Sequence, residues 1–375
     1  MLDARTAWLA GMVAITALVA GCDDEPRSRI VDGCTAPDRT TPLVFTSSGR
    51  QLYGFIDPPA TDPPYPAVLL IHDAGRTDIT RGNGDFAELR GALREAGIAA
   101  VVWDAPGSGC SGGRYRGIAD LYVRSDDVLA AAAALSVRDD IDASRVGALA
   151  LGEGAWAAAM AAARGDSLGF LIILGGPAGD PIERITHFGR ENLKREGYSD
   201  DEAESLAKRL GDALAMMRDQ APYRDFRAAV EPLSQYPLLP PMSESGGDVY
   251  ATERRYDELR ESAVLHIEPK VFLAALEIPV LALWGEHDAW VDPRHAEAVY
   301  REAFALAAND DATIKVIEGA DHALCESRAG GHSEAPAPRC RLAAGVLETI
   351  TSWLERHGFT GSGERQSRAP QPVAR

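Results

Sequence analysis

The segment Arg145–Trp156 constrains the fold more than any other part of this 375-residue chain. An apolar run, Val146–Leu151, leads through a turn at Gly152 into a stretch of alanines and other helix-forming residues. The residues two positions before and after the turn, Ala150 and Gly154, are both small. Small residues at these places are typical of a tight, strained turn between a buried strand and a helix, where crowding excludes larger side chains. The segment therefore predicts a strand, a sharp turn and a helix in an α/β protein.

Short apolar runs alternate with helical patterns along the chain, which is typical of a mostly parallel sheet with helices on both faces. We expect strands at Leu43–Thr46, Gln51–Ile56, Ala67–Ile71, Ile98–Trp103, Val146–Leu151, Phe170–Leu174, Val280–Leu283 and Thr313–Ile317. We expect core helices at Phe86–Ala96, Val123–Leu135, Trp156–Ala163 and Leu342–Arg356. The first two strands form an opening hairpin in this interpretation.

One connection is far longer than the others. Between Leu174 and Val280 lie roughly a hundred residues without a convincing strand, well beyond a normal connection. Ser199 and Glu202 have the spacing of a capping box, which indicates the start of a helix. Apolar residues then follow at helical spacing, namely Ala203, Leu206, Leu210, Leu214 and Met217. The sequence therefore predicts a helical cap over residues 180–270, inserted into the sheet domain.

The first residues have the features of a targeting segment. Arg5 precedes an apolar stretch, Thr6–Val19, that is too short to span a bilayer comfortably. Leu18-Val19-Ala20-Gly21-Cys22 resembles a bacterial lipobox, which implies a lipid on Cys22 and a place in the bacterial cell envelope. A chance cysteine after an ordinary signal peptide or an uncleaved anchor is the alternative.

These features divide the chain into six parts. We expect a signal peptide at 1–21, a linker at 22–40, a core at 41–179 and 271–358, the cap at 180–270 and a disordered tail at 359–375. The net charge of −18 argues against nucleic acid as a partner, because phosphates require a basic surface.

Export would place the remaining four cysteines in an oxidising compartment. Three pairings are possible. We expect Cys325–Cys340, which closes a loop rich in glycine and proline, and therefore Cys34–Cys110; free buried thiols are the alternative. No Cys-x-x-Cys pair and no spacing of Cys and His indicates zinc, so we expect neither metal nor cofactor.

Chemically useful residues follow three of the predicted strands. One strand runs into His72-Asp73-Ala74-Gly75, where main-chain N–H groups of Asp73 and Ala74 could form an oxyanion hole with the N–H of Glu153. Two later strands end near Asp288 and His322. The carboxyl ends of parallel strands meet at one edge of a sheet, so we expect these residues to lie together.

The order of turn, acid and histidine resembles that of the α/β-hydrolase superfamily over roughly residues 40–357. The similarity is closer to a bacterial branch of esterase-like and acyl-hydrolase-like proteins, whose turn reads Gly-His-Ser-Glu-Gly-Gly. The segments 139–147, 171–177, 104–111 and 285–288 also match that branch. The resemblance implies an α/β-hydrolase fold.

The resemblance also assigns roles to residues. The acid falls on Asp288, the general base on His322 and the nucleophile on Gly152, which has no side chain to attack with. Leu151 stands where the branch has histidine, which makes the pocket floor more apolar. His322 and Asp288 could also be relics without a catalytic role.

Other residues are weaker candidates. Asp292 is an alternative acid, although it lies beyond the strand end. Glu153 is a possible carboxylate nucleophile, but a turn centred on it would need a small residue at Leu151. Ser108, Cys110 and Ser111 lie on a loop that could approach the site, and we expect His72 to brace its own turn.

The sequence thus favours a lipid-anchored α/β-hydrolase-fold protein without ordinary serine-hydrolase activity, which binds a small-molecule ligand under the cap or a partner in the envelope. The alternative is an active hydrolase of ester, thioester or amide bonds. It would use His322 and Asp288 to activate water, or another nucleophile. If the hydroxyl is the only missing group, Gly152→Ser should restore esterase activity.

Overall fold

The computed structural model describes residues 29–361 except 74, 80–81, 83–85, 116–120, 239–251, 262–264 and 328–340. The predicted signal peptide, Cys22, Ala74 and Cys340 therefore lie outside the described residues, as does the tail from residue 362 on. Within the described part, no helix is both long and apolar enough to cross a membrane.

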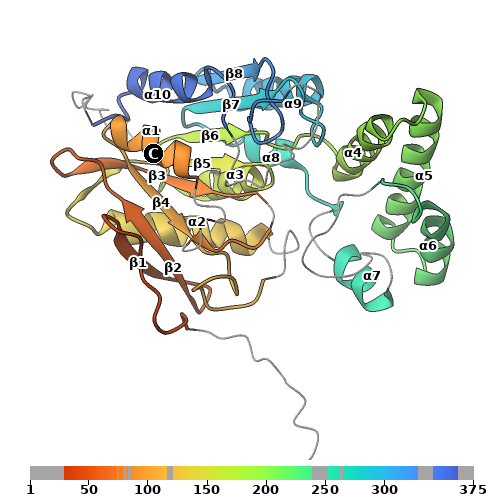
Figure 1. The fold of residues 1–375 in the computed structure, drawn as a ribbon, viewed down its shortest axis with the longest axis horizontal. Coiled ribbons are helices and arrows are strands. Elements are labelled where there is room, and N and C mark those ends of the chain that lie inside the picture. Colours follow the sequence, from red (N-terminus) through yellow and green to blue (C-terminus); the bar gives the residue numbers. More distant parts are fainter. Residues whose placement is uncertain are drawn as a thin grey trace, which may run out of the picture.

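An eight-stranded sheet forms the centre of the molecule, in the order β1-β2-β4-β3-β5-β6-β7-β8 (Figure 1). The strands are β1 Thr41–Ser47, β2 Arg50–Asp57, β3 Tyr65–Ile71, β4 Ala99–Trp103, β5 Ile141–Leu151, β6 Leu171–Leu174, β7 Val280–Gly285 and β8 Ala312–Ile317. The hairpin of β1 and β2 is antiparallel, and β2 joins β4 in antiparallel fashion. All other pairs are parallel. The mostly parallel sheet that the sequence predicts is confirmed.

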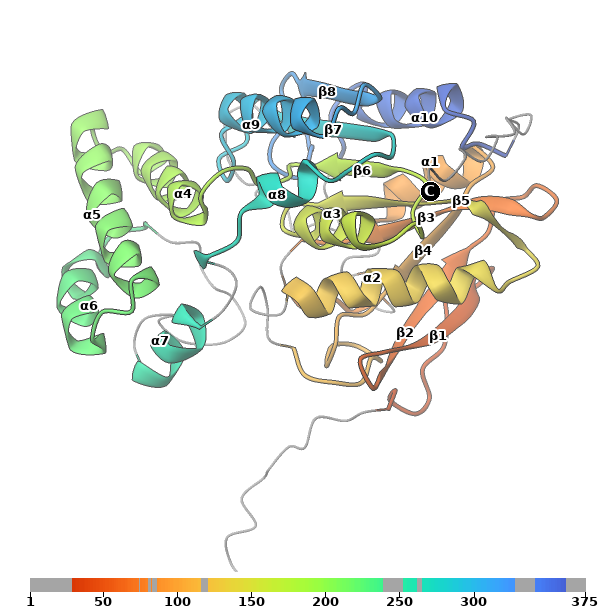
Figure 2. The ribbon, with the colours of Figure 1, turned by 180° about the vertical axis from the view of Figure 1, so that it is seen from behind.

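Helices cover both faces of this sheet. The helices α1 Ala87–Glu95 and α10 Val346–Arg356 pack together on one face. On the other face lie α2 Leu121–Ser136, α3 Gly154–Arg164, α8 Pro269–Leu273 and α9 Pro293–Leu306 (Figure 2). Strand β3 shows why two layers are needed, because all seven of its residues are buried. Successive side chains point to opposite faces, so Leu69 and Ile71 join one apolar core while Val68 and Leu70 join the other.

Helices fill most of the long connection between β6 and β7, at one end of the sheet (Figure 1). They are α4 Pro181–Arg195, α5 Asp200–Arg218, α6 Tyr223–Val230 and α7 Glu253–Arg260, with a 3-10 turn at Glu231–Leu233. Ser199 and Glu202 form the expected capping box at the start of α5. These helices have their own apolar core, which includes Leu210, Leu214 and Phe226.

Most element boundaries agree with the expected ones to within two residues, and two differ by more. Strand β5 begins at Ile141 rather than Val146, because Tyr65 pairs with Ile141 beyond an irregularity in the ladder. Helix α10 begins at Val346, after Gly345 adopts a left-handed conformation (φ +83°) that ends the preceding loop.

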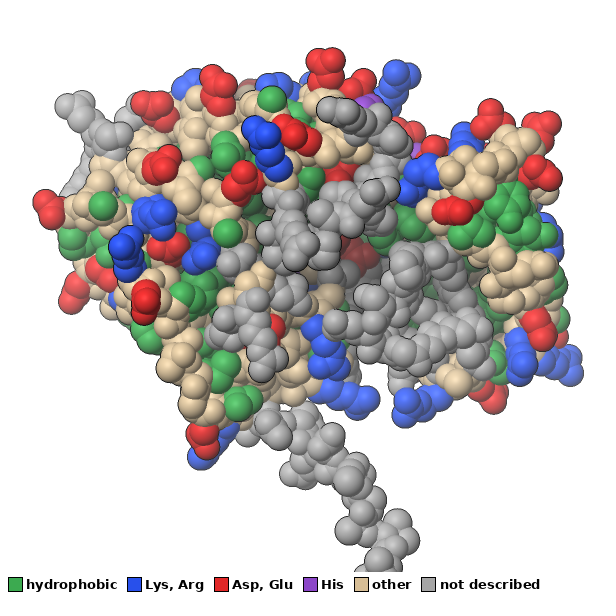
Figure 3. All heavy atoms as spheres, in the orientation of Figure 1, with side chains coloured by type: hydrophobic (Ala, Val, Ile, Leu, Met, Phe, Trp, Pro, Cys, Tyr) green, Lys and Arg blue, Asp and Glu red, His purple; other side chains and the backbone are tan. Residues whose placement is uncertain are grey.

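The predicted disulfide Cys34–Cys110 is present and ties the segment before β1 to the loop after β4. Cys325 is disulfide-bonded as well. Because Cys340 lies outside the described residues, the pair Cys325–Cys340 stays a prediction. On the face drawn in Figure 3, acidic and basic side chains are interspersed over the core and the cap helices.

Candidate active site

Gly152 lies at the sharp turn between β5 and α3. Its φ of +52° is in the left-handed region, and its N–H donates a hydrogen bond to the carbonyl of Leu174 at 2.9 Å. A Cβ atom at Gly154 would lie 2.5 Å from the carbonyl oxygen of His72, so only glycine fits there. The close approach of the β3 loop therefore explains why one of the two flanking residues has no side chain.

The carboxylate of Asp73 fills the space above Gly152. A Cβ atom built on Gly152 would lie 2.3 Å from Oδ1 and 2.4 Å from Cγ of Asp73. The main-chain N–H of Glu153 donates a hydrogen bond of 2.7 Å to the same Oδ1. The N–H group that the sequence assigns to an oxyanion hole is therefore bound to a side chain of the protein itself.

This contact adds a neighbour of Gly152 that the sequence did not indicate. Besides the small neighbours Ala150 and Gly154, a serine at residue 152 would need the Asp73 side chain, which extends from the loop after β3, to move away. The hydroxyl is thus not the only difference from a serine-hydrolase site.

His322 and Asp288 come together as the spacing indicates. His322 Nδ1 lies 2.8 Å from Asp288 Oδ2, and the other oxygen, Oδ1, accepts hydrogen bonds from the N–H groups of Trp290 and Val291 at 2.8 and 2.9 Å. On the opposite side of the ring, His322 Nε2 lies 3.6 Å from Asp73 Oδ2. The imidazole is therefore held between two carboxylates.

The two carboxylates decide the charge of His322. Burial alone would lower the pKa of the ring, but the negative charges of Asp288 and Asp73 outweigh it and raise the pKa of His322 to about 10. At neutral pH both ring nitrogens then carry protons. The two carboxylates therefore favour the protonated form of His322, in which the ring has no free nitrogen to accept a proton.

The side chain of Glu153 points to the cap rather than to His322. Its Oε1 lies 2.9 Å from Arg184 Nη2 of α4, and both side chains are about one-tenth exposed. The guanidinium of Arg184 also lies over the ring of Trp156, 5.6 Å from its centre. Burial raises the pKa of Glu153, and the charge of Arg184 opposes that shift. This ion pair joins the start of α3 to the first cap helix.

Three of the weaker candidates, Asp292, Cys110 and Ser111, have structural partners elsewhere. Asp292 caps α9 and accepts hydrogen bonds from the N–H groups of Arg294 and His295. Cys110 forms its disulfide, and Ser111 bonds to the main chain of Asp104. Ser108 is buried in the same loop.

His72 is partly buried in the loop after β3. Burial, together with the charge of Arg124, lowers the pKa of His72 to about 4. Its Nδ1 lies 3.2 Å from the carbonyl oxygen of Asp73. These contacts fit the bracing role that we expect for His72.

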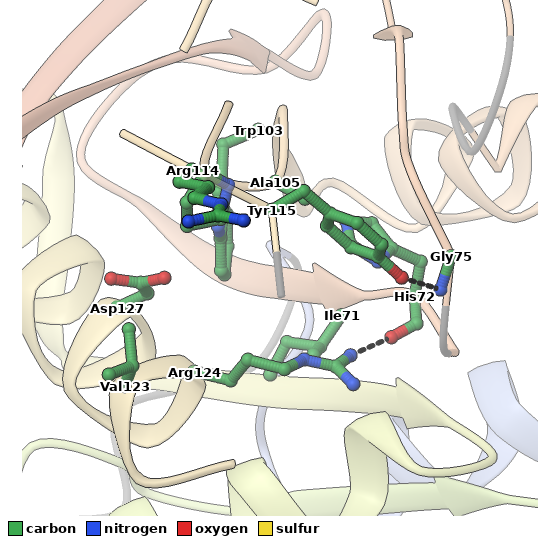
Figure 4. Close-up of a pocket in the computed structure, with 11 residues that line it drawn as sticks. Ile71, His72, Gly75, Trp103, Ala105, Arg114, Tyr115, Val123, Arg124 and Asp127 are labelled. Atoms are coloured by element: carbon green, nitrogen blue, oxygen red, sulfur yellow. Dashed lines mark hydrogen bonds between the residues drawn. The ribbon is translucent and has the colours of Figure 1, made fainter. Parts of the chain in front are cut away.

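A pocket lies beside this loop, near the end of β3 (Figure 4). Its lining includes Ile71, His72, Trp103, Arg114, Tyr115 and Arg124. Arg124 donates hydrogen bonds to the carbonyls of His72 and Asp73, and the hydroxyl of Tyr115 accepts one from the N–H of Gly75. These contacts hold the main chain on both sides of Asp73. Among the described residues, no group of three or more His, Cys, Asp or Glu side chains could hold a metal ion.

Asp73 is the residue whose role the sequence analysis missed. The sequence predicts that the main-chain N–H of Asp73 is an oxyanion donor. In the structure, the side chain of Asp73 fills the space above Gly152 and binds the N–H of Glu153. The sequence contains one feature that could have indicated this role, namely an acidic residue in the loop after β3 together with a glycine at residue 152.

No model of a known protein family matches the sequence. The uncharacterized protein YcjY of Escherichia coli (strain K12) is 25% identical over 273 residues, which cover 69% of this chain and 81% of YcjY. The solved esterase Pf2001 of Pyrococcus furiosus is similar with a TM-score of 0.51 and 15% identity, covering 88% of this chain and 96% of that one. DcsB, solved in complex with a substrate analogue, has a TM-score of 0.53 and 15% identity over 84% and 98% of the two chains. Together with the sheet topology, these similarities confirm the α/β-hydrolase fold.

Proposed function

We propose that this protein is a lipid-anchored member of the bacterial cell envelope that has no serine-hydrolase activity and binds a small-molecule ligand beneath its cap. The observation that carries the proposal is the Asp73 carboxylate above Gly152, hydrogen-bonded to the N–H of Glu153. A serine hydrolase needs both this space and this N–H group, one for the hydroxyl and one for the oxyanion.

The state of His322 supports the same proposal. Since its pKa is raised to about 10, it is protonated at neutral pH and cannot take a proton from a hydroxyl or from water. Activation of water by His322 and Asp288 would also need the space above Gly152, which Asp73 fills. Loss of a serine nucleophile alone typically costs about a millionfold in turnover.

The test is labelling by a fluorophosphonate probe, together with hydrolysis of short-chain and long-chain nitrophenyl esters. We expect neither from the wild type. Gly152→Ser alone should also stay inert, because its Cβ meets the Asp73 carboxylate. The double variant Asp73→Ala/Gly152→Ser frees the space and removes one carboxylate from His322, so it should gain labelling and esterase activity. Both gains should disappear when His322→Ala is added.

A matched control separates the carboxylate from a general effect of lost charge. Asp62 is exposed and lies away from the site, so Asp62→Ala/Gly152→Ser should stay as inert as the single variant. Strong labelling of the wild type would show that another residue is a nucleophile and would overturn the proposal. Ligand binding is tested by titration with ethyl butyrate, which should raise the melting temperature without being consumed.

A further inference from the structure

The pocket beside the loop after β3 carries an excess of positive charge. Arg114 and Arg124 both line it (Figure 4), and no ion pair between described residues includes either of them. Asp127 is the only acidic residue among the described residues of the lining, and its Oδ1 already lies 2.6 Å from Nη2 of Arg50. Because the net charge of the chain is −18, this excess is a local property of the pocket. The pocket therefore favours a ligand that brings a negative charge.

Arg124 is the more buried of the two arginines, since it is partly buried and Arg114 is exposed. Its Nη2 donates hydrogen bonds to the carbonyls of His72 and Asp73, at 2.5 and 3.2 Å. Its Nη1 has no hydrogen-bond partner among the described residues and is not buried. A partly buried charge has lost some of its hydration, and an anion that binds beside it compensates for that loss. One part of the guanidinium thus holds the main chain, and another part can bind a ligand.

The other walls of the pocket fit an apolar group. They include the side chains of Ile71, Trp103, Ala105, Pro106 and Val123. His72 adds no charge at neutral pH, because burial and the charge of Arg124 lower the pKa of His72 to about 4. A small inorganic anion would contact the guanidinium groups alone, whereas a molecule with an apolar chain would also cover these walls. The pocket therefore matches a ligand with one charged end and one apolar end.

We propose that this pocket binds an organic carboxylate with a short apolar chain, which rests on the proposed function as a binding protein and names the chemical class of the ligand. A guanidinium donates strong, charge-assisted hydrogen bonds to a carboxylate. Arg124 offers Nη1 for such a bond, and Arg114 supplies a second positive charge at the exposed side of the pocket. The chain of the ligand lies against Trp103 and Val123.

Hexanoate and ethyl butyrate are matched probes, because they have the same numbers of carbon and oxygen atoms and differ in charge. Titration calorimetry with the full-length protein at neutral pH should show that hexanoate binds at least about tenfold more tightly, as expected for a charge-assisted hydrogen bond. Hexanoate should also bind more tightly than acetate, which has no such chain. Its affinity should decrease as the salt concentration rises, because salt screens the attraction to the exposed Arg114.

Arg114 offers the sharpest variant, because it is exposed and its replacement should leave the fold intact. Arg114→Glu exchanges an attraction for a repulsion, so it should weaken hexanoate binding about tenfold and leave ethyl butyrate binding unchanged. Arg356→Glu is the matched control, because Arg356 is also exposed and belongs to α10, on the other face of the sheet from α2. This control should bind hexanoate as the wild type does.

Arg124→Gln should weaken hexanoate binding about tenfold or more, since it removes the charged donor inside the pocket. Because Arg124 also holds the loop after β3, Arg114→Glu decides the question if Arg124→Gln does not fold.

Equal binding of hexanoate by the wild type and Arg114→Glu would overturn the inference, as would hexanoate binding no tighter than that of ethyl butyrate or acetate. Equal losses in Arg114→Glu and Arg356→Glu would also overturn it, because they would reflect only the net charge of the chain. The proposed function is tested separately, by fluorophosphonate labelling for serine chemistry and by ethyl butyrate for the binding of a neutral molecule. Labelling of the wild type would overturn that function and leave the preference for hexanoate unaffected.

Discussion

At the scale of single residues, the position of His322 between Asp73 and Asp288 gives stability a distinctive pH dependence. A folded-state pKa of about 10 lies above the value of about 6.5 expected in the unfolded chain. The ion pair therefore contributes its full stability below about pH 6.5, and the contribution is lost as the pH rises towards about 10.

We accordingly predict that wild type exceeds His322→Gln in free energy of unfolding by the largest amount at about pH 6, and that the difference shrinks steadily up to about pH 10. Urea denaturation at several pH values measures this. Asp73→Asn removes one of the two carboxylates beside His322. In this variant, the contribution of His322 to the free energy of unfolding should therefore begin and finish its decrease at lower pH. A difference between wild type and His322→Gln that is constant over this range would contradict the arrangement of charges described above.

At the scale of elements, the ion pair of Glu153 and Arg184 fastens the cap helix α4 to the turn that begins α3. Both side chains are nearly buried, so removal of one partner leaves the other charge without compensation. We predict that Arg184→Met lowers the free energy of unfolding by about 3–5 kcal/mol, and that the double variant Glu153→Gln/Arg184→Met recovers most of the loss. A double-mutant cycle by urea denaturation gives both values. If the losses of the two single variants, Glu153→Gln and Arg184→Met, simply add up in the double variant, the ion pair does not couple α3 to α4.

The same scale shows what the sequence could and could not predict. Apolar runs and their periodicity located the strands of the sheet, and the residues after them located Asp288 and His322 at one edge. These inferences succeed because strand direction fixes where the main chain delivers a residue. The side chain of Asp73 escaped prediction because its place depends on how closely the β3 loop approaches Gly152 and Glu153, which are far away in the sequence. The start of β5 was missed for a similar reason, since its first residue pairs beyond an irregularity in the ladder.

At the scale of the whole molecule, the Cys34–Cys110 disulfide closes a loop with a sequence separation of 76 residues. In the chain-entropy model, a loop of this length stabilises the folded state by roughly 4–5 kcal/mol. We predict a clearly lower melting temperature for Cys34→Ala/Cys110→Ala by calorimetry. Cys325→Ala/Cys340→Ala serves for comparison, because the shorter loop predicts a smaller loss, about 3 kcal/mol. Mass mapping of unreduced peptides should join Cys325 to Cys340, and a free thiol at Cys340 would contradict that pairing.

The proposed lipid anchor at Cys22 would determine where the whole molecule acts. If Leu18–Cys22 is a lipobox, the signal peptidase requires the modified cysteine, so Cys22→Ala should accumulate as an unprocessed precursor without lipid. Cells grown with a fatty-acid analogue should label the wild type and not this variant. Cys34→Ala is the matched control, because it removes a cysteine that the structure places in a disulfide and should leave the labelling unchanged. A wild-type chain that takes up no label and begins at a residue other than Cys22 would rule out the tether, and the ligand site would then belong to a protein free to diffuse.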